Sequence, residues 1–359
     1  MFRVYQRYII KEFINKFITI SLVFFTLTII LGILEEISFF KNSEVNIFLP
    51  YLITFLGAPI TLFEIFPFIF LISTQFLFYD LFKKNELNLL KSNGLSNLKI
   101  INILFTTSVV MGLFAVIIFY NAASTLNFFY LDIKNNHTKD NKYLAVVTEN
   151  GLWLKDEIDE TILIVKAKFI EGENLNDVVI NKFNKNFDLI NTIQSKKVNI
   201  IEKKWVIFDA IVTKKNISKK ENEEINLRTS FDQEKIQSLF SNISTLNLIK
   251  LFDLKKDYEN LGYSSDEIVI HLLKLFSTPL FYGVLTILSS IIMFNFRGEK
   301  SLFFHIILGI LMSVIIYYIN FLFSSLGNSG KIPIIISIFL PILFISLISI
   351  IGLIRINEK

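Results

Sequence analysis

Charged residues are missing from long stretches of this 359-residue chain and are concentrated elsewhere. Phe17–Leu34, Leu302–Gly330 and Ile332–Ile354 contain no Lys, Arg, Asp or Glu, whereas Lys134–Lys256 is dense in Lys, Asp and Glu. A soluble domain of this length interleaves charged and apolar residues throughout its sequence. In a chain that is 52% hydrophobic, this segregation predicts membrane-spanning helices and one water-exposed domain.

Several segments are long and apolar enough to cross a bilayer, whose hydrocarbon core of about 30 Å requires about 20 helical residues. They must be helical, because lipid offers no partner to a free backbone amide. We predict six spans, at residues 14–34, 62–81, 99–120, 269–294, 302–323 and 332–354. The first has too long an apolar run for a signal peptide, and no small-residue cleavage site follows it. The predicted fold class is therefore a polytopic α-helical membrane protein with three plus three spans.

The start of the second span is marked by prolines. Pro50 and Pro59 indicate that residues 50–61 form a short element at the outer surface, with the span beginning at residue 62. Glu64 is then expected near the interface, where its surroundings satisfy the carboxylate. The alternative is a functional carboxylate within the membrane.

Lys and Arg gather at one end of the predicted spans, which sets their orientation. The opposite short loops carry Lys41 and Lys331 alone. We therefore expect an inner-membrane protein with both termini in the cytoplasm and the large middle domain in the periplasm. The residues at the cytoplasmic end are Arg3, Arg7, Lys11, Lys16, Lys83, Lys84, Lys91, Lys99, Arg297, Lys300, Arg355 and Lys359.

The middle domain alternates apolar and polar residues with a period of two, which is typical of strands. Such short strands predict an all-β, jelly-roll-like domain at residues 121–243. An open edge strand there would be a docking site for another strand, and protected edges are the alternative. The strand-like runs are Leu144–Val147, Thr161–Val165, Val178–Ile180, Lys197–Ile201 and Trp205–Phe208.

A helical connector is predicted at residues 244–268, because Leu246–Leu261 has helical apolar spacing and ends at Gly262. Ser264–Glu267 then reads as a capping box that opens the fourth span. The predicted domains are thus spans one to three within 1–120, the β domain at 121–243, the connector, and spans four to six within 269–359.

A short amphipathic helix is predicted at about 82–94, in the cytoplasmic loop between spans two and three. Gly94 suits the C-terminal end of a helix, and Ser96 or Asn97 could cap the next one. The helix could lie in the lipid interface or fit a groove on a cytoplasmic partner. The residues of its apolar face are Leu81, Leu87, Leu90 and Leu95.

No catalytic, cofactor or metal site is predicted. The chain has no cysteine, and its histidines, His137, His271 and His305, form no ligand pattern. A net charge of +4 gives no reason to expect nucleic acid as a partner. Lys274 is the main ionisable exception within the spans and could extend to the outer interface. Energy for any transport would come from another subunit.

The layout resembles the LptF/LptG (YjgP/YjgQ-type) permease family, the membrane subunits of the ABC transporter that extracts lipopolysaccharide from the bacterial inner membrane. Asn85–Gly94 resembles the family string SELVVMRASG, and Gly151–Asp156 the string GLWxKD. The latter and Leu261–Ser264 favour LptG over LptF. The resemblance covers essentially the whole chain. Its other local matches are Tyr8–Phe13, Phe63–Pro67, Lys331–Pro333 and Leu340–Pro341.

This resemblance implies a non-catalytic permease subunit with several partners. These are a cytoplasmic LptB-like ATPase dimer, an LptF-like paralogous permease, a single-span LptC-like protein, an LptA-like periplasmic bridge and lipopolysaccharide itself. By this resemblance the loop helix is an ATPase-coupling helix. Substitution of Leu87 or Leu90 by Asp is then expected to uncouple transport from ATP hydrolysis. The coupling residues implied are Glu86, Leu87, Leu90, Lys91 and Gly94.

The resemblance also implies a lipid cavity between this chain and its paralogue, bordered by spans one and five. The candidate wall residues are Lys41, Tyr317, Tyr318 and Phe321. One departure concerns the outer end of span one. Some members of the family have basic residues there that attract lipid phosphates, whereas this chain has Glu35 and Glu36.

Other functions remain open at this point. An FtsX-like mechanotransmission subunit would have four spans and its large domain after the first, unlike the layout predicted here. The LptF paralogue of the same complex is a second alternative. A membrane enzyme that acts on lipids would need a cluster of catalytic residues, and none stands out in the sequence.

Overall fold

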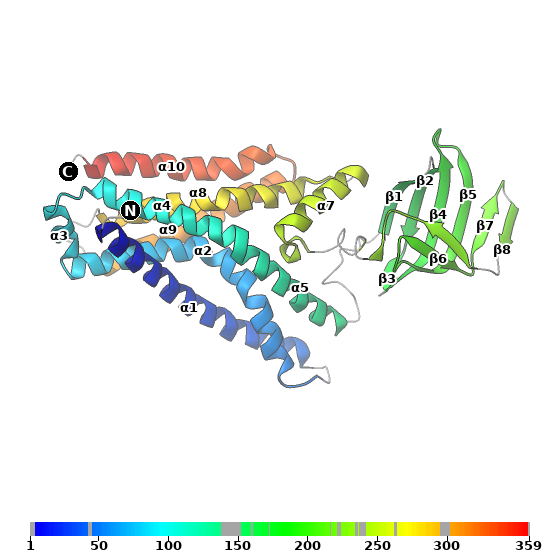
Figure 1. The fold of residues 1–359 in the computed structure, drawn as a ribbon, viewed down its shortest axis with the longest axis horizontal. Helices are drawn as coiled ribbons and strands as arrows, with labels where there is room; N and C mark the ends of the chain where they lie inside the picture. Colours follow the sequence, from blue (N-terminus) through cyan, green and yellow to red (C-terminus); the bar gives the residue numbers. More distant parts are fainter. Residues whose placement is uncertain are drawn as a thin grey trace. The chain divides into compact units, whose positions relative to one another are not determined.

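The computed structural model confirms the predicted fold class of a six-helix membrane bundle interrupted by an antiparallel β domain (Figure 1). Among the described residues, six helical segments are long and apolar enough to cross a membrane. The model describes residues 4–41, 45–137, 152–158, 161–171, 173–215, 217–220, 224–233, 236, 242–261, 264–294 and 302–357. The chain divides into one unit of residues 1–130 and 266–359 and a second unit of residues 131–265.

The membrane-spanning helices follow the apolar runs of the sequence, and the helix at residues 121–136 crosses from the first unit into the second. Every spanning helix runs past its predicted span at one end or both, except that the last one begins two residues later than predicted. The helices are α1 Val4–Phe40, α2 Leu49–Lys83, α3 Glu86–Ser92, α4 Asn97–Phe114, the π-helix η1 Ala115–Tyr120, α5 Asn121–Asn136, α8 Asp266–Phe294, α9 Leu302–Asn328 and α10 Ile334–Asn357.

The prediction of a separate surface element at residues 50–61 is wrong, because α2 is continuous from Leu49 to Lys83. Pro50 lies in the first turn, where its missing amide costs nothing. Pro59 and Pro67 lie inside the helix, which neighbouring helices in a membrane bundle allow. Glu64 consequently lies near the middle of a 35-residue helix and not at its start.

The third span also runs on past its predicted end at residue 120. α4 passes through η1 directly into α5, so residues 121–136 are helical where we expected the β domain to begin. Single π-turns of this kind are inserted into α-helices and often occur at functional sites. Here η1 ends at Tyr120, whose hydroxyl lies 2.8 Å from Nε2 of His271 on α8.

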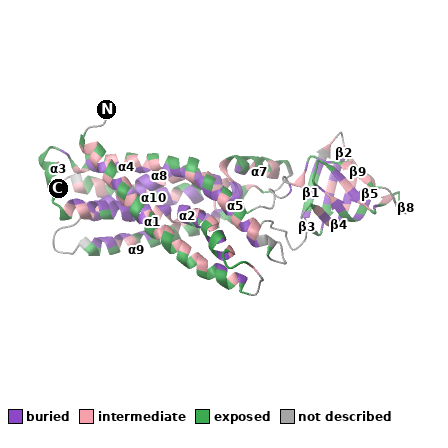
Figure 2. Ribbon diagram, turned by 60° about the horizontal axis from the view of Figure 1, so that its bottom comes forward, coloured by how far each residue is buried: buried purple, intermediate pink, exposed green. Residues whose placement is uncertain are grey.

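α8 is the central helix of the bundle and α1 a peripheral one. The buried share of the most apolar stretch rises from 0% in α1 to 67% in α8. Exposed residues line much of α1, whereas buried ones are frequent on α8 (Figure 2). α8 packs against α2, α4, α9 and α10, and α1 packs mainly against α2.

Small and polar residues allow these helices to approach closely, as is usual in membrane bundles. A Cβ on Gly112 would lie 2.7 Å from Cα of Pro279, so α4 and α8 touch backbone to backbone there. Ser289 of α8 donates its hydroxyl to the carbonyl of Leu71 on α2 at 2.7 Å. These contacts fix the relative positions of α2, α4 and α8.

The second unit contains an antiparallel sheet in the order β1-β2-β4-β5-β6-β9, with β3 on β4, β7 on β5 and β8 on β7. The predicted runs at 161–165, 178–180 and 205–208 lie in β2, β4 and β6, and that at 197–201 begins in β5; Leu144–Val147 lies outside the described residues. The strands are β1 Leu152–Ile158, β2 Thr161–Ala167, β3 Phe169–Glu171, β4 Asn174–Asn184, β5 Leu189–Asn199, β6 Lys204–Phe208, β7 Ile211–Lys214, β8 Ile217–Lys220 and β9 Ile225–Arg228.

Two buried polar groups hold the segment after β9 against the sheet. The indole of Trp205 donates to the carbonyl of Phe231 at 2.8 Å. Asp156, which ends the Gly-Leu-Trp-x-Lys-Asp string, accepts hydrogen bonds from the amide and the hydroxyl of Ser230. The aspartate of this string therefore has a structural role within the β domain.

The predicted connector is also helical. The short 3-10 helix η2 spans Ile243–Thr245, and α7 spans Leu248–Leu261. Lys255 and Glu259, one turn apart on α7, form an ion pair of 2.7 Å. Gly262 lies outside the described residues. The fourth span begins at Asp266, inside the predicted capping box.

Candidate functional site

The loop helix predicted from the sequence is α3, a seven-residue helix between α2 and α4. A helix this short is not stable by itself, so its ends must be fixed by the chain. Asn85 precedes it in the left-handed conformation, with φ of 58°. Asn88 donates its side-chain amide to the side-chain oxygen of Asn85 at 2.6 Å.

The C-terminal end of α3 is a Schellman motif. The amide of Leu95 bonds to the carbonyl of Leu90 at 3.2 Å, and that of Gly94 to Lys91 at 2.9 Å. Gly94 has a φ of +83°, a conformation that favours glycine. Ser96 then caps α4 by accepting a hydrogen bond from the amide of Lys99. Both end signals read from the sequence are present.

The apolar face predicted for this helix is turned toward the rest of the chain. Leu81, Leu87 and Leu95 are 1%, 2% and 8% exposed, and Leu90 is half-buried. Leu89 is instead 60% exposed. The buried leucines anchor α3 to its own bundle, so the surface available to a partner is centred on Leu89.

Two of the predicted coupling residues are engaged within the chain. Glu86 accepts a hydrogen bond from the hydroxyl of Tyr8 on α1, over 2.5 Å. Lys91 lies over the ring of Phe294 at the end of α8, 5.6 Å from its centroid, within cation–π range. α3 is therefore connected to both the first and the fourth spans.

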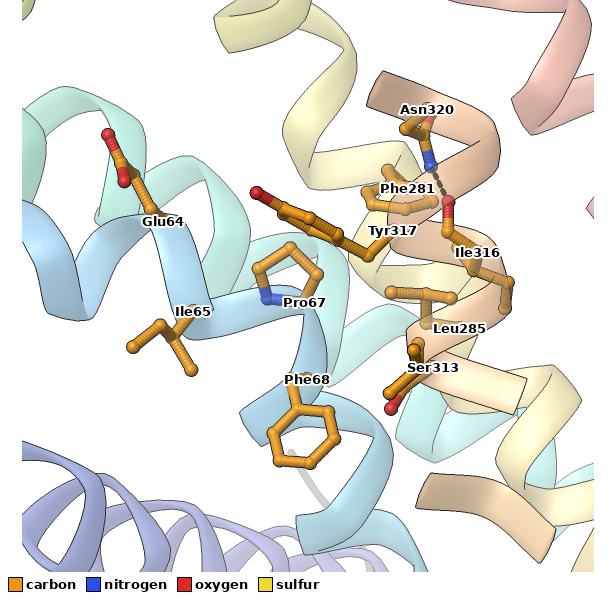
Figure 3. A pocket seen from close by; sticks show the side chains of 11 residues that line it. Glu64, Ile65, Pro67, Phe68, Phe281, Leu285, Ser313, Ile316, Tyr317 and Asn320 are labelled. Carbon is orange, nitrogen blue, oxygen red and sulfur yellow. Dashed lines mark hydrogen bonds between the residues drawn. The ribbon is translucent and has the colours of Figure 1, made fainter. Parts of the chain in front are cut away.

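A pocket of about 280 Å³ lies between α2, α8 and α9 (Figure 3). Its walls are mainly apolar, and Glu64, Ser313 and Asn320 add polar atoms. Tyr317 lies across it, with its hydroxyl directed toward the side of Glu64 (Figure 3). The lining residues are Glu64, Ile65, Pro67, Phe68, Phe281, Leu285, Ser313, Val314, Ile316, Tyr317 and Asn320.

The predicted cavity residues do not all meet in this pocket. Tyr317, Tyr318 and Phe321 are all exposed on α9, and of the three Tyr317 alone is among the lining residues. Tyr317 and Tyr318 contact each other edge to face at 5.8 Å. Lys41 is exposed directly after α1 and is not among the lining residues.

The two carboxylates near the C-terminal end of α1 have different environments. Glu36 is 2% exposed and accepts a hydrogen bond from the hydroxyl of Tyr130 on α5, at 2.7 Å. Glu35 is exposed. Glu36 therefore joins α1 to the third span, and Glu35 alone of the pair presents a charge at the surface.

Sequence reasoning missed three features of this region. The first is the exposure of Leu89. The spacing of apolar residues in an amphipathic helix does not show which of its leucines the rest of the chain covers. The Tyr8–Glu86 bond joins residues 78 positions apart, although Tyr8 lay in a string already noted. The contribution of Glu64 to a pocket wall is the third feature, and its expected position at the interface stays a prediction.

The family model for the lipopolysaccharide export system permease LptF/LptG matches residues 7–355 of the chain. Among curated proteins, no sequence matches it. The match spans both groups of helices and the β domain between them, so it covers α3, the pocket and the sheet together. The chain is a multi-pass membrane protein that belongs to the LptF/LptG family of lipopolysaccharide export system permeases.

Proposed function

We propose that this chain is a permease subunit of an ABC transporter that extracts lipopolysaccharide from the inner membrane and passes it to a periplasmic bridge. The subunit itself is non-catalytic, and an LptB-like ATPase dimer hydrolyses ATP in the cytoplasm. The single observation that carries this proposal is α3, whose two ends are fixed and whose exposed face is centred on Leu89.

The geometry of α3 suits a helix that receives a push from a partner. The buried Leu87 keeps it attached to the bundle while Leu89 is presented outward. A partner groove lined by apolar side chains would take up such an anchor. The Lys and Arg residues around α3 agree with a cytoplasmic position for this loop under the positive-inside rule, which supports cytoplasmic termini and a periplasmic β domain.

The pocket supports lipid as the transported molecule. Acyl chains require an apolar wall, and the walls formed by α2, α8 and α9 are mainly apolar. Tyr317 and Asn320 add polar atoms that could contact a head group. An LptF-like paralogue would complete the cavity on its other side, with Lys41, Tyr318 and Phe321 of this chain as further candidate contacts.

The β domain supports passage to a bridge of similar domains. Among the described strands, β1 pairs with β2 alone and β9 with β6 alone, so both lie at the ends of the sheet. A strand from an LptC-like or LptA-like partner could add to such an edge. β8, also at an edge, contains Lys219 and Lys220, and charged side chains of this kind discourage unwanted pairing.

The other readings are less well supported. A four-span FtsX-like subunit does not fit six spans with a domain after the third. Within the family, the Gly151–Asp156 string favours the LptG type over the LptF type, and the LptF paralogue is the second candidate.

Gentle purification of the tagged chain from its native membrane tests the proposal. A small ATPase, a paralogous permease and lipopolysaccharide should co-purify with it. Recovery of the chain with an ATPase but with neither a paralogue nor lipopolysaccharide would contradict the transporter assignment and favour mechanotransmission.

A further inference from the structure

The inner end of α1 is attached to the α2–α4 loop region by two polar contacts. Tyr8 donates its hydroxyl to Glu86, the first residue of α3, over 2.5 Å. Lys16 pairs with Asp80, near the end of α2, over 2.5 Å. Tyr8 and Lys16 lie two turns apart, so the two contacts hold roughly 12 Å of α1.

Aromatic rings also join this part of α1 to α2. Phe13 packs against Phe70, and Phe17 against Phe66 and Phe70, all on α2. Apolar packing is not directional, so ring contacts alone allow α1 to slide or rotate along α2. The hydrogen bond and the ion pair, which require particular atoms at particular distances, fix the position of α1 along its axis.

We propose that the Tyr8–Glu86 and Lys16–Asp80 contacts make the inner end of α1 move together with α3. A displacement of α3 by an ATPase then reaches α1 directly, in addition to its path through α2. This inference rests on the proposed function, because it assigns the transmission step that starts at the same coupling helix. Tyr8 is a positioning residue that acts through Glu86.

The peripheral position of α1 makes this link consequential. α1 packs mainly on α2, and much of its outer half is exposed on the chain, including Leu27, Leu31 and Leu34. A helix with few neighbouring helices loses little packing energy when it is displaced. The contacts at the inner end of α1 therefore determine its position. In this proposal the carboxylate of Glu86 bonds to α1 within the permease, while Leu89 contacts the ATPase.

The first test uses Tyr8→Phe, which keeps the ring and removes the hydroxyl, in the complete reconstituted complex. Lipopolysaccharide released per ATP hydrolysed should fall by about tenfold or more, the effect of losing one hydrogen bond to a charged group. The KM for ATP should stay unchanged, because the nucleotide site lies in the partner. Tyr5→Phe, one turn away on the same helix, is the matched control and should behave as wild type.

A double-mutant cycle separates the link from any direct effect of Glu86 on the ATPase. In a Glu86→Gln background, Tyr8→Phe should have little further effect. A full additional loss there, or equal behaviour of Tyr8→Phe and Tyr5→Phe, would overturn the inference. An inactive wild-type complex would instead count against the proposed function.

A distance measurement tests the link without any transport assay. The chain has no cysteine, so spin labels can be placed by Val4→Cys on α1 and Ser92→Cys on α3, both at exposed positions. The distance distribution should be narrow, with or without nucleotide-bound ATPase, and should broaden in Tyr8→Phe. A distribution that is unaffected by Tyr8→Phe would overturn the inference.

Discussion

At the scale of single residues, polar groups inside the bundle hold its helices in register. Ser108 and Thr286 lie with their hydroxyls 2.7 Å apart between α4 and α8. Gln75 of α2 donates its side-chain amide to the carbonyl of His305 on α9, at 3.0 Å. In lipid, such bonds and close packing replace the hydrophobic drive that joins helices in water.

Gly309 makes room for Gln75, and Gly309→Ala should therefore destabilise the bundle. An added Cβ would lie 1.8 Å from Nε2 of Gln75, so the amide must shift and its bond to His305 is lost. We expect a loss of about 2 kcal/mol in the free energy of unfolding. Denaturation of the purified chain in detergent measures this loss.

The double variant Gln75→Ala/Gly309→Ala provides the control. Removing the Gln75 side chain also removes the clash, so the double variant should be more stable than the sum of the two single changes predicts. Simple additivity would show that α2 and α9 do not meet at this point.

The environment of a single residue is also the feature that the sequence predicts least well. Glu35 and Glu36 looked equivalent in the sequence, yet Glu36 is buried against Tyr130 and Glu35 is exposed. Which of two neighbouring carboxylates is buried depends on a tyrosine 94 positions away. No local pattern carries that information.

At the scale of elements, α3 is defined by its ends more than by its own propensity. Both end signals, Gly94 and Ser96, could be predicted because turn and cap chemistry is local. The start of α2 could not, because prolines that end helices in water are accommodated inside membrane helices. Capping and turn rules therefore predicted the C-terminal end of α3 and the start of α4 correctly. They failed for the start of α2, because its position depends on the neighbouring helices.

Gly94→Ala should weaken the end of α3. No atom lies within 4 Å of the added Cβ, so the cost is the left-handed backbone alone, about 1 kcal/mol. Amide hydrogen exchange of α3 should accelerate accordingly. Gly94→Asn is the control and should exchange more slowly than Gly94→Ala, because asparagine tolerates this conformation better.

Leu89→Asp should uncouple the chain from the proposed ATPase without unfolding the chain. Leu89 is 60% exposed, so the fold does not depend on it, but a carboxylate would not enter an apolar groove. Co-purification of the ATPase and stimulated ATP hydrolysis should both fall while the amount of folded chain stays the same.

Leu87→Asp is the contrasting variant, because Leu87 is 2% exposed. It should reduce the amount of folded chain itself, since it buries a charge. Equal amounts of folded chain for the two variants, with the ATPase retained by Leu89→Asp, would contradict the assignment of the outward face.

At the scale of the whole molecule, the separation of charged from apolar residues was sufficient to predict the architecture. Six spans and an inserted strand-rich domain follow from where charges are absent, because a bilayer excludes them over about 30 Å. The pocket between α2, α8 and α9 could not be predicted, because it depends on how three distant segments pack.

The most direct test of the permease assignment is ATP-dependent lipopolysaccharide release from proteoliposomes that contain the purified complex. The proposal predicts release to an added periplasmic acceptor protein only when ATP is hydrolysed, with loss of release in Leu89→Asp. Release at the same rate without ATP, or ATP hydrolysis with no lipopolysaccharide released, would contradict it.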